Sequence, residues 1–223
     1  MKRVSKQRQS GEARKMQLMV ATLNSISKHG YLNSTINTIS AESGLSRGLI
    51  SHYFENKDDL LTYAHKYYLQ NIDDFHRHVI VSIKTGHFTK LFYSACVPFL
   101  RDMGYQRIVI HYMSAAWIMP DVLKMHRDLW QRYRANVERR VASIARDRQM
   151  EIDVKMTATT LIQLVDGLWL GLTMEEVYTR EDCCKIIRKW MCDQFGENPD
   201  DYPLVPTFDI ENFETSAPLP PSG

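Results

Sequence analysis

Residues 35–54 hold the pattern that most restricts how this chain can fold. Two short segments with helical spacing of apolar residues flank Gly44-Leu45, and each begins at a residue that caps helices well, Thr35 or Ser46. Glycine reaches the left-handed conformation that a tight turn between helices needs. Apolar side chains can then clamp the two helices at a fixed angle, namely Ile36, Ile39, Leu45, Ile50 and Phe54. The pattern predicts a helix-turn-helix whose second helix is short and exposed.

The polar residues of that second helix are of the kinds that contact DNA. Arg47 can donate two hydrogen bonds to guanine, and Ser51, one turn later, can reach a base edge or a phosphate. Leu49, expected to be exposed, suits a thymine methyl, and Gly48 lets the backbone approach closely. Flanking donors usually hold phosphates. The predicted DNA-binding set is Thr35, Ser46, Arg47, Gly48, Leu49, Ser51, His52, Tyr53 and Lys57. The alternative is that residues 35–54 form only a compact helical hairpin.

The charge distribution favours a polyanionic partner for the front of the chain. Residues 1–66 carry ten Lys or Arg against five Asp or Glu, although the whole chain has a net charge of only +2. Lys2, Arg3, Lys6 and Arg8 can form an arm that follows the DNA backbone or reaches the minor groove. The caps, the turn glycine, the apolar clamp and this basic flank together favour DNA binding.

Helical periodicity continues through most of the chain, and no alternating strand pattern occurs, so the predicted fold class is all-α. Ser10 is expected to cap the first helix. The expected helices cover about 12–29, 34–43, 46–54, 56–79, 87–103, 105–117, 121–149, 153–176 and 180–195. The predicted organisation is a basic arm (1–10), a three-helix DNA-binding domain (11–66), a larger helical effector-binding and dimerisation domain (67–196), and an acidic, proline-rich, extended tail (197–223).

Other functional classes find less support. The longest apolar stretch, 161–172, is too short and too polar to span a bilayer, and no signal peptide is evident, so a cytoplasmic protein is expected. No metal-ligand spacing or cofactor motif is present, and Cys96, Cys183, Cys184 and Cys192 are expected to be reduced and mostly buried. An enzyme using His111, His126, Asp147, Asp153 or Asp166 stays an alternative without a supporting motif, as does a DNA-independent interaction module.

Residues 12–66 resemble the TetR family of bacterial repressors. The resemblance rests on Gly30, Thr35, Ile39, Gly44-Leu45-Ser46, Gly48, His52-Tyr53-Phe54, Lys57 and Leu60. Ser40 and Ser43 stand where the family usually has alanine, which is compatible with the fold because serine is small. Ser51 stands where tyrosine is frequent, which puts the operator sequence in doubt.

The stretch Gly48-Leu-Ile-Ser-His-Tyr-Phe54 is similar to the BetI-type subgroup, repressors of choline-to-betaine genes, as are 164–170 and, more loosely, 111–134. The resemblance implies a homodimer that binds a palindromic operator, is modulated by a small molecule and is no enzyme. It also implies that the segments 153–176 and 180–195 form a four-helix dimer interface. Apolar stripes support this expectation, with interface residues Leu161, Val165, Leu168, Leu172, Ile187, Trp190 and Met191. In a monomer these would be ordinary core.

The expected effector site is aromatic and acidic. Asp166 and Trp169 are three residues apart and share a helix face, and a carboxylate beside an indole suits a quaternary ammonium. The candidate pocket residues are Phe92, Tyr105, Tyr112, Trp117, Trp130, Asp166 and Trp169. The alternative is that the aromatic rings are core residues and Asp166 a buried, hydrogen-bonded acid.

Overall fold

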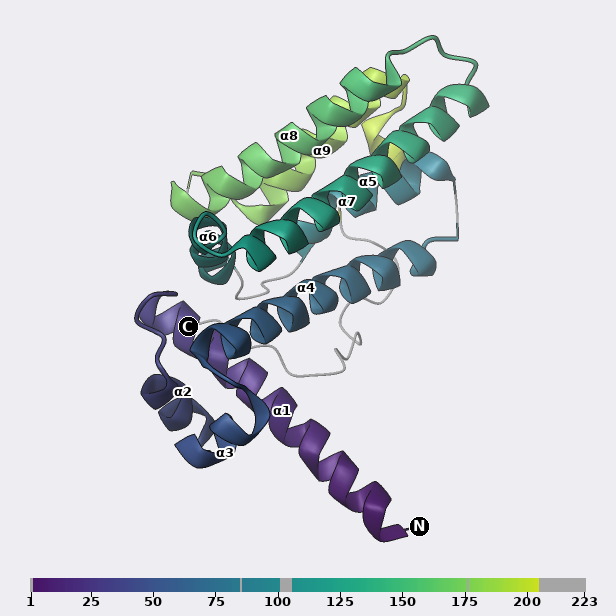
Figure 1. Cartoon of the computed structure of the whole chain (residues 1–223). Coiled ribbons are helices and arrows are strands. Elements are labelled where there is room, and N and C mark those ends of the chain that lie inside the picture. The colour runs from purple at the N-terminus through teal and green to yellow at the C-terminus, as the bar shows by residue number, and fades with distance from the viewer. Residues whose placement is uncertain (1, 85, 101–105, 176, 205–223) are drawn as a thin grey trace. The chain divides into compact units, whose positions relative to one another are not determined.

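The described part of the chain consists almost entirely of helices (Figure 1). The computed structural model describes residues 2–84, 86–100, 106–175 and 177–204, with residues 2–10 and 106 described by their backbone alone. No strand occurs among these residues. The helices are α1 (Lys2–His29), α2 (Ile36–Ser43), α3 (Arg47–Tyr53), α4 (Lys57–Ser82), α5 (His87–Leu100), α6 (Gln106–Ala115), α7 (Pro120–Asp147), α8 (Val154–Met174) and α9 (Arg180–Phe195), followed by the 3-10 turn η1 (Pro199–Asp201). The all-α class is thus confirmed.

Helix boundaries follow local chemistry. Thr179 caps α9 in a reciprocal capping box with Asp182, and Gly196, with a φ of 68°, ends it in the left-handed conformation. Pro120 occupies the first position of α7, where its missing N–H costs no hydrogen bond. The predicted cap at Ser10 is wrong, because α1 begins at Lys2 and the backbone of residues 2–10 continues the helix.

The described residues form two compact units, and the division runs through α4 and α7. The first unit holds residues up to Asp73 together with 106–126, and the second holds 74–100 and 127–204. Helix α6 therefore packs in the same unit as α1, although the sequence assigned it to the larger domain. The functional boundary at residue 66 stays a prediction.

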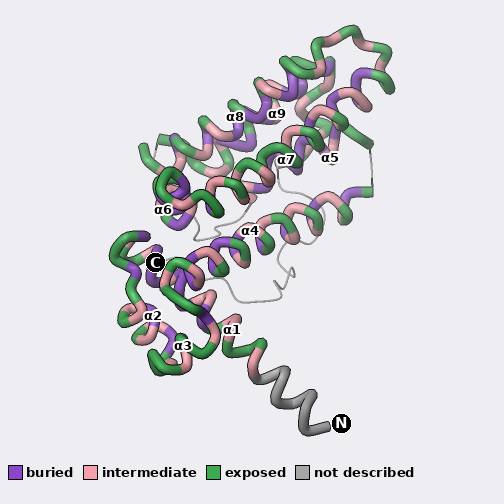
Figure 2. Tube along the Cα trace, viewed as in Figure 1, coloured by how far each residue is buried: buried purple, intermediate pink, exposed green. Residues whose placement is uncertain are grey.

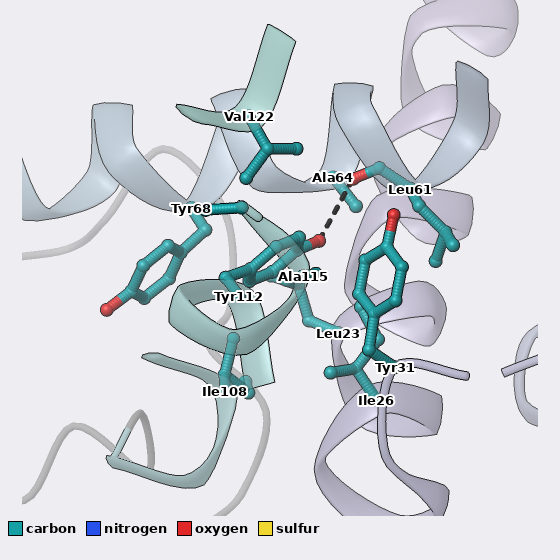
Figure 3. Packing of buried hydrophobic residues seen from close by; sticks show 11 residues of the cluster. Leu23, Ile26, Tyr31, Leu61, Ala64, Tyr68, Ile108, Tyr112, Ala115 and Val122 are labelled. Atoms are coloured by element: carbon teal, nitrogen blue, oxygen red, sulfur yellow. Dashed lines mark hydrogen bonds between the residues drawn. The ribbon is translucent and has the colours of Figure 1, made fainter. Parts of the chain in front are cut away.

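The first unit has two apolar clusters that meet on α4. The helix-turn-helix cluster consists of Leu18, Ala21, Ile39, Ile50, Phe54 and Leu60. The second cluster joins α1, α4, α6 and the start of α7, and Figure 3 shows ten of its residues labelled: Leu23, Ile26, Tyr31, Leu61, Ala64, Tyr68, Ile108, Tyr112, Ala115 and Val122. Because Leu60 and Leu61 are consecutive, one turn of α4 connects the two clusters.

In the second unit, α5 packs against α8 and α9 and is buried along most of its length (Figure 2). All four cysteines are buried and unpaired, as expected. The start of the tail differs from its expected extended form. Residues 197–204 pack on this unit, where Tyr93 donates a 2.8 Å hydrogen bond to the Pro203 carbonyl and Arg188 donates one of 3.1 Å to the Tyr202 carbonyl. Residues 205–223 lie outside the described part of the chain.

Candidate DNA-binding surface and ligand site

The turn between α2 and α3 is braced by hydrogen bonds. Gly44 has a φ of 67°, and its N–H donates to the Ser40 carbonyl. The Ser40 hydroxyl donates to the Leu45 carbonyl over 2.6 Å, and the Ser43 hydroxyl accepts from the Leu45 N–H over 3.2 Å. The two serines that depart from the family pattern thus satisfy the turn backbone, a role alanine could not perform.

Helix α3 is held on one side and open on the other. Ser46 caps it by accepting from the Leu49 N–H over 3.3 Å, and Ile50 and Phe54 anchor it in the helix-turn-helix cluster. Six of the predicted DNA-binding residues are exposed: Thr35, Ser46, Arg47, Gly48, Ser51 and His52. Leu49, Tyr53 and Lys57 are half-buried, so Leu49 presents less surface than the sequence suggested.

The structure places one further polar residue at this surface. Asn37, exposed on α2, accepts a 3.3 Å hydrogen bond from the Arg47 guanidinium. This contact joins the Arg47 side chain of α3 to α2. Sequence reasoning missed Asn37 because its partner is ten residues away on another helix; a polar side chain on the open face of the preceding helix was the available signal.

A second group of candidate site residues lies in the second unit, and α4, α5, α7 and α8 each contribute at least one of them. His76 Nε2 and Ser94 Oγ are 2.6 Å apart, and the Tyr133 ring meets those of His76 and Trp130 edge-on, with centroids 6.2 and 5.7 Å apart. Burial and, second, the charge of Asp166 raise the pKa of Tyr133. Tyr133 was not predicted, although Trp130 and Tyr133, three apart on α7, form a recognisable aromatic pair.

Asp166 is the acid of this cluster. Burial raises its pKa to about 6, while the charge of Arg134 acts in the opposite direction. A carboxyl of this kind changes charge close to neutral pH. Aromatic rings, a hydroxyl and an acid in one partly buried place are suited to holding an organic cation.

The other predicted pocket residues are dispersed. Trp169 is half-buried, and Phe92 is buried against Tyr93 and Tyr202. Tyr112 belongs to the core of the first unit, and Trp117, in the same unit, is 83% exposed. Tyr105 lies outside the described residues.

The predicted dimer residues mostly face the chain's own interior. Leu161, Val165, Leu168, Ile187 and Met191 are buried, and Leu172 and Trp190 are half-buried. The opposite side of α8 is open, as its green segments in Figure 2 show. It carries a stripe of exposed residues at helical spacing, Met156, Thr160, Gln163, Gly167, Leu170 and Met174, called here the outer stripe of α8.

A braced helix-turn-helix with an open recognition helix, joined to a helical body, defines a DNA-binding transcriptional regulator. Comparison with protein families agrees. Residues 18–64 match the bacterial regulatory proteins of the tetR family, and residues 106–195 match the C-terminal region of BetI-type transcriptional repressors. The two matches together span more than half of the chain. The chain belongs to the TetR family of bacterial transcriptional regulators, which are not enzymes, and its body is of the BetI type.

Individual relatives agree with this placement. The HTH-type transcriptional regulator BetI of Vibrio parahaemolyticus serotype O3:K6 (strain RIMD 2210633) is 27% identical over 192 residues, covering 79% of this chain and 88% of the relative. BetI of Stenotrophomonas maltophilia (strain R551-3) is 26% identical over 168 residues, covering 70% and 80%.

Solved structures share the fold. A candidate transcriptional regulator from Pseudomonas aeruginosa PAO1 aligns with a TM-score of 0.72 at 24% identity, over 86% of this chain and 95% of its own. Another from Saccharomonospora viridis, in complex with choline, aligns with a TM-score of 0.71 at 20% identity, over 81% and 95%. Among the described residues of this chain, no helix is long and apolar enough to span a membrane, and no group of three or more His, Cys, Asp or Glu could hold a metal ion.

Proposed function

We propose that this chain represses transcription by binding a palindromic operator as a homodimer, and that an organic cation weakens that binding. The observation that carries the proposal is the open face of α3, where Arg47, Gly48 and Ser51 are exposed on a helix only seven residues long. So short a helix contacts few base pairs, and a two-fold dimer doubles the contacts. In this proposal residues 11–66 bind DNA, residues 67–196 bind the effector and the second subunit, and the basic segment 1–10 follows the DNA backbone.

The side chains divide into two roles. Arg47, oriented by Asn37, contacts a guanine, and Ser51 and Leu49 contact neighbouring base edges. Donors at the helix ends hold phosphates and set the register; these are Thr35, Ser46, His52, Tyr53 and Lys57. Gly48 allows the DNA to approach the backbone of α3 closely. A Cβ built at Gly48 meets no other atom within 4 Å, so the packing of the protein itself does not require a glycine there.

Selection from a random pool of duplexes tests the DNA-binding part. The purified chain should enrich an inverted repeat whose half-sites are about one helical turn apart, and Arg47→Ala should enrich none. A promoter carrying the enriched site should be silenced in cells that express the chain and not in cells that express Arg47→Ala. Enrichment of a single, unrepeated site would contradict the two-fold arrangement, and activation of the promoter would contradict repression.

The homodimer is proposed to form through α8 and α9, with the outer stripe of α8 facing the partner. Met156, Leu170 and Met174 are large apolar residues left exposed in the single chain, at 63%, 51% and 62%. Gly167 lies between them with open space around it, so a second helix can approach closely. Val177 and Tyr178 extend the exposed apolar surface into the loop that follows. Large apolar residues left exposed along one face of a helix favour a protein interface there.

The effector is proposed to be a quaternary ammonium held by Asp166 and the rings of Trp130 and Tyr133, with Trp169 on the same helix face as Asp166. The support is the partly buried carboxylate beside aromatic rings, together with the shared fold of the Saccharomonospora viridis protein that was crystallised with choline. The charge of the carboxylate attracts the cation, and the ring faces bind its methyl groups.

Choline and its uncharged analogue 3,3-dimethyl-1-butanol form a matched pair of probes for this site. Choline should raise the melting temperature of the chain and release it from the operator, and the neutral analogue should do neither. Trp130→Ala and Trp169→Ala should remove the choline response while leaving DNA binding in the absence of choline intact. An equal response to both probes, or none to choline and betaine, would refute the cation site and leave the regulator assignment standing.

A further inference from the structure

A buried histidine, His65, and a half-buried one, His126, lie together where α4 meets α7 in the first unit. The ring centroids of His65 and His126 are 4.7 Å apart, and the rings are tilted by 35°. His65 has no solvent exposure, and among the described residues neither of its ring nitrogens has a hydrogen-bond partner; His126 Nε2 is also buried and has no partner in this part of the chain. Buried polar atoms without partners cost stability, so this arrangement calls for an explanation.

Tyrosine side chains that carry no charge surround the two histidines. The ring of Tyr68, on α4, stacks with that of His65 at a centroid distance of 6.1 Å. The ring of Tyr112, on α6, has its centroid 4.0 Å from that of His65. Tyr112 donates a 2.9 Å hydrogen bond to the Leu61 carbonyl, drawn in Figure 3, and contacts Tyr31 edge-on. Phenols are neutral in acid at their ordinary pKa, and burial raises the pKa of Tyr112 and, with the charge of Asp58, that of Tyr31 to about 12.

A positive charge on the pair is disfavoured by burial and by the second ring. Burial lowers the pKa of His65 to about 3, and the charge of His126 lowers it further; burial also lowers the pKa of His126. A proton on His65 would lie in an apolar cluster beside a second imidazole, where both desolvation and repulsion oppose it. The two histidines therefore resist protonation while α4 and α7 are packed together, and they would accept protons more readily if the two helices separated.

Helix α4 connects this junction to the DNA-binding surface. Leu61 and Ala64 belong to the cluster that contains Tyr112, and Leu60 belongs to the helix-turn-helix cluster with Ile50 of α3. A change in the packing of α4 against α7 therefore acts on the helix that also anchors α3.

We propose that His65 and His126 form a pH-sensitive latch, closed while both rings are neutral, whose opening in acid loosens α4 from α7 and weakens DNA binding. In the open state the histidines regain ordinary pKa values near 6.5. Since the folded pKa values are depressed, the latch contributes fully above about pH 6.5 and is lost progressively as the pH falls from there toward the folded values. Each ring favours the open state by up to about tenfold per pH unit below 6.5.

The test compares the full-length chain with His65→Phe and His126→Phe in chemical unfolding at pH 7.5 and 5.5. Phenylalanine keeps the ring and removes the proton-binding nitrogens, so each variant should be at least as stable as the original at pH 7.5 and lose less stability at pH 5.5. For each ring removed, the rise in the unfolding constant from pH 6.5 to 5.5 should shrink by up to about fivefold. His87→Asn is the control, because the exposed His87 lies outside the latch and beside Asp147; removing it should not reduce the loss of stability in acid.

Two readouts extend the test beyond stability. Operator affinity should fall more between pH 7.5 and 5.5 for the original chain than for either phenylalanine variant, because the pH response of the phosphate contacts is common to all. In NMR spectra the His65 ring should show no titration near pH 6.5 while the chain stays folded. Titration of His65 near 6.5, or an unchanged pH dependence in both variants, would overturn the proposal; if one variant does not fold, the other decides.

Discussion

At the scale of single residues, alanine substitutions of Arg47 and Lys57 should affect DNA binding in different ways. We expect Arg47→Ala to cost about 1–3 kcal/mol at the operator and to relax preference at one base pair, because an arginine that pairs with guanine reads sequence. Lys57→Ala should weaken all duplexes alike and flatten the salt dependence, because a phosphate contact releases counterions. Affinity measured on operator and random duplexes at several salt concentrations separates the two effects, and equal losses on both duplexes for both variants would contradict these roles.

Asp166 gives the cation site its own pH dependence. Its pKa of about 6 means that the carboxyl is charged at neutral pH and protonated in mild acid. Choline affinity should therefore be constant above about pH 7 and fall up to about tenfold per pH unit below 6, since only the carboxylate attracts the cation. Titration calorimetry at pH 5.5, 6.5 and 7.5 measures this.

Asp166→Asn, which keeps the shape and removes the charge, is the control for that titration. It should bind choline weakly and with no pH dependence. The histidine latch in the first unit also weakens below pH 6.5 and could add a second pH dependence. The measurement is therefore repeated on His65→Phe, in which the latch cannot be protonated at His65. Unchanged pH dependence of choline binding in Asp166→Asn would assign it to another group.

At the scale of elements, replacing either of two glycines of the helix-turn-helix by alanine should change the free energy of unfolding, in opposite directions. Gly44 has a positive φ, so Gly44→Ala should lower the free energy of unfolding by about 1 kcal/mol even though a Cβ there meets no atom within 4 Å. Gly48 is helical and also has open space, so Gly48→Ala should raise it by up to about 0.5 kcal/mol.

Operator binding should separate these variants further. The methyl group of Gly48→Ala stands on the open face of α3 and should weaken binding while the fold gains stability. Gly44→Ala should bind the operator normally wherever it remains folded, because Gly44 supports the turn and not the proposed DNA contacts. A Gly48→Ala variant with unchanged affinity would show that DNA does not approach this backbone.

At the scale of the whole molecule, α8 offers a matched pair of substitutions. Leu170→Glu places a charge on the outer stripe, where it should yield a folded monomer that no longer recognises a palindrome. Leu168→Glu buries a charge in the chain's own core and should unfold it. Sedimentation gives the mass of each variant and circular dichroism its fold. A folded Leu170→Glu variant that remains dimeric would place the interface elsewhere.

Local sequence determined most of the elements, because caps, turn glycines and apolar spacing act within a few residues. The segment predicted at 180–195 is α9, and the Thr35 and Ser46 caps, the Gly44 turn and the Ile39–Ile50–Phe54 clamp lie where their residue types require. The start of α1 was missed because no cap residue is needed for a helix to continue through Ser10. The residues that carry the family resemblance are in this locally determined part.

Only the tertiary structure decided which side of each helix is covered, and by what. Periodicity identified an apolar stripe on α8 but could not tell the chain's own α5 and α9 from a second subunit, since both would cover the same residues equally well. The same holds for interactions between distant segments: the hydrogen bond of Asn37 with Arg47, the electrostatic effect of Asp166 on Tyr133, and the ring contact of His65 with His126. Their chemistry depends on burial and separation in space, and neither quantity is encoded within one turn of helix.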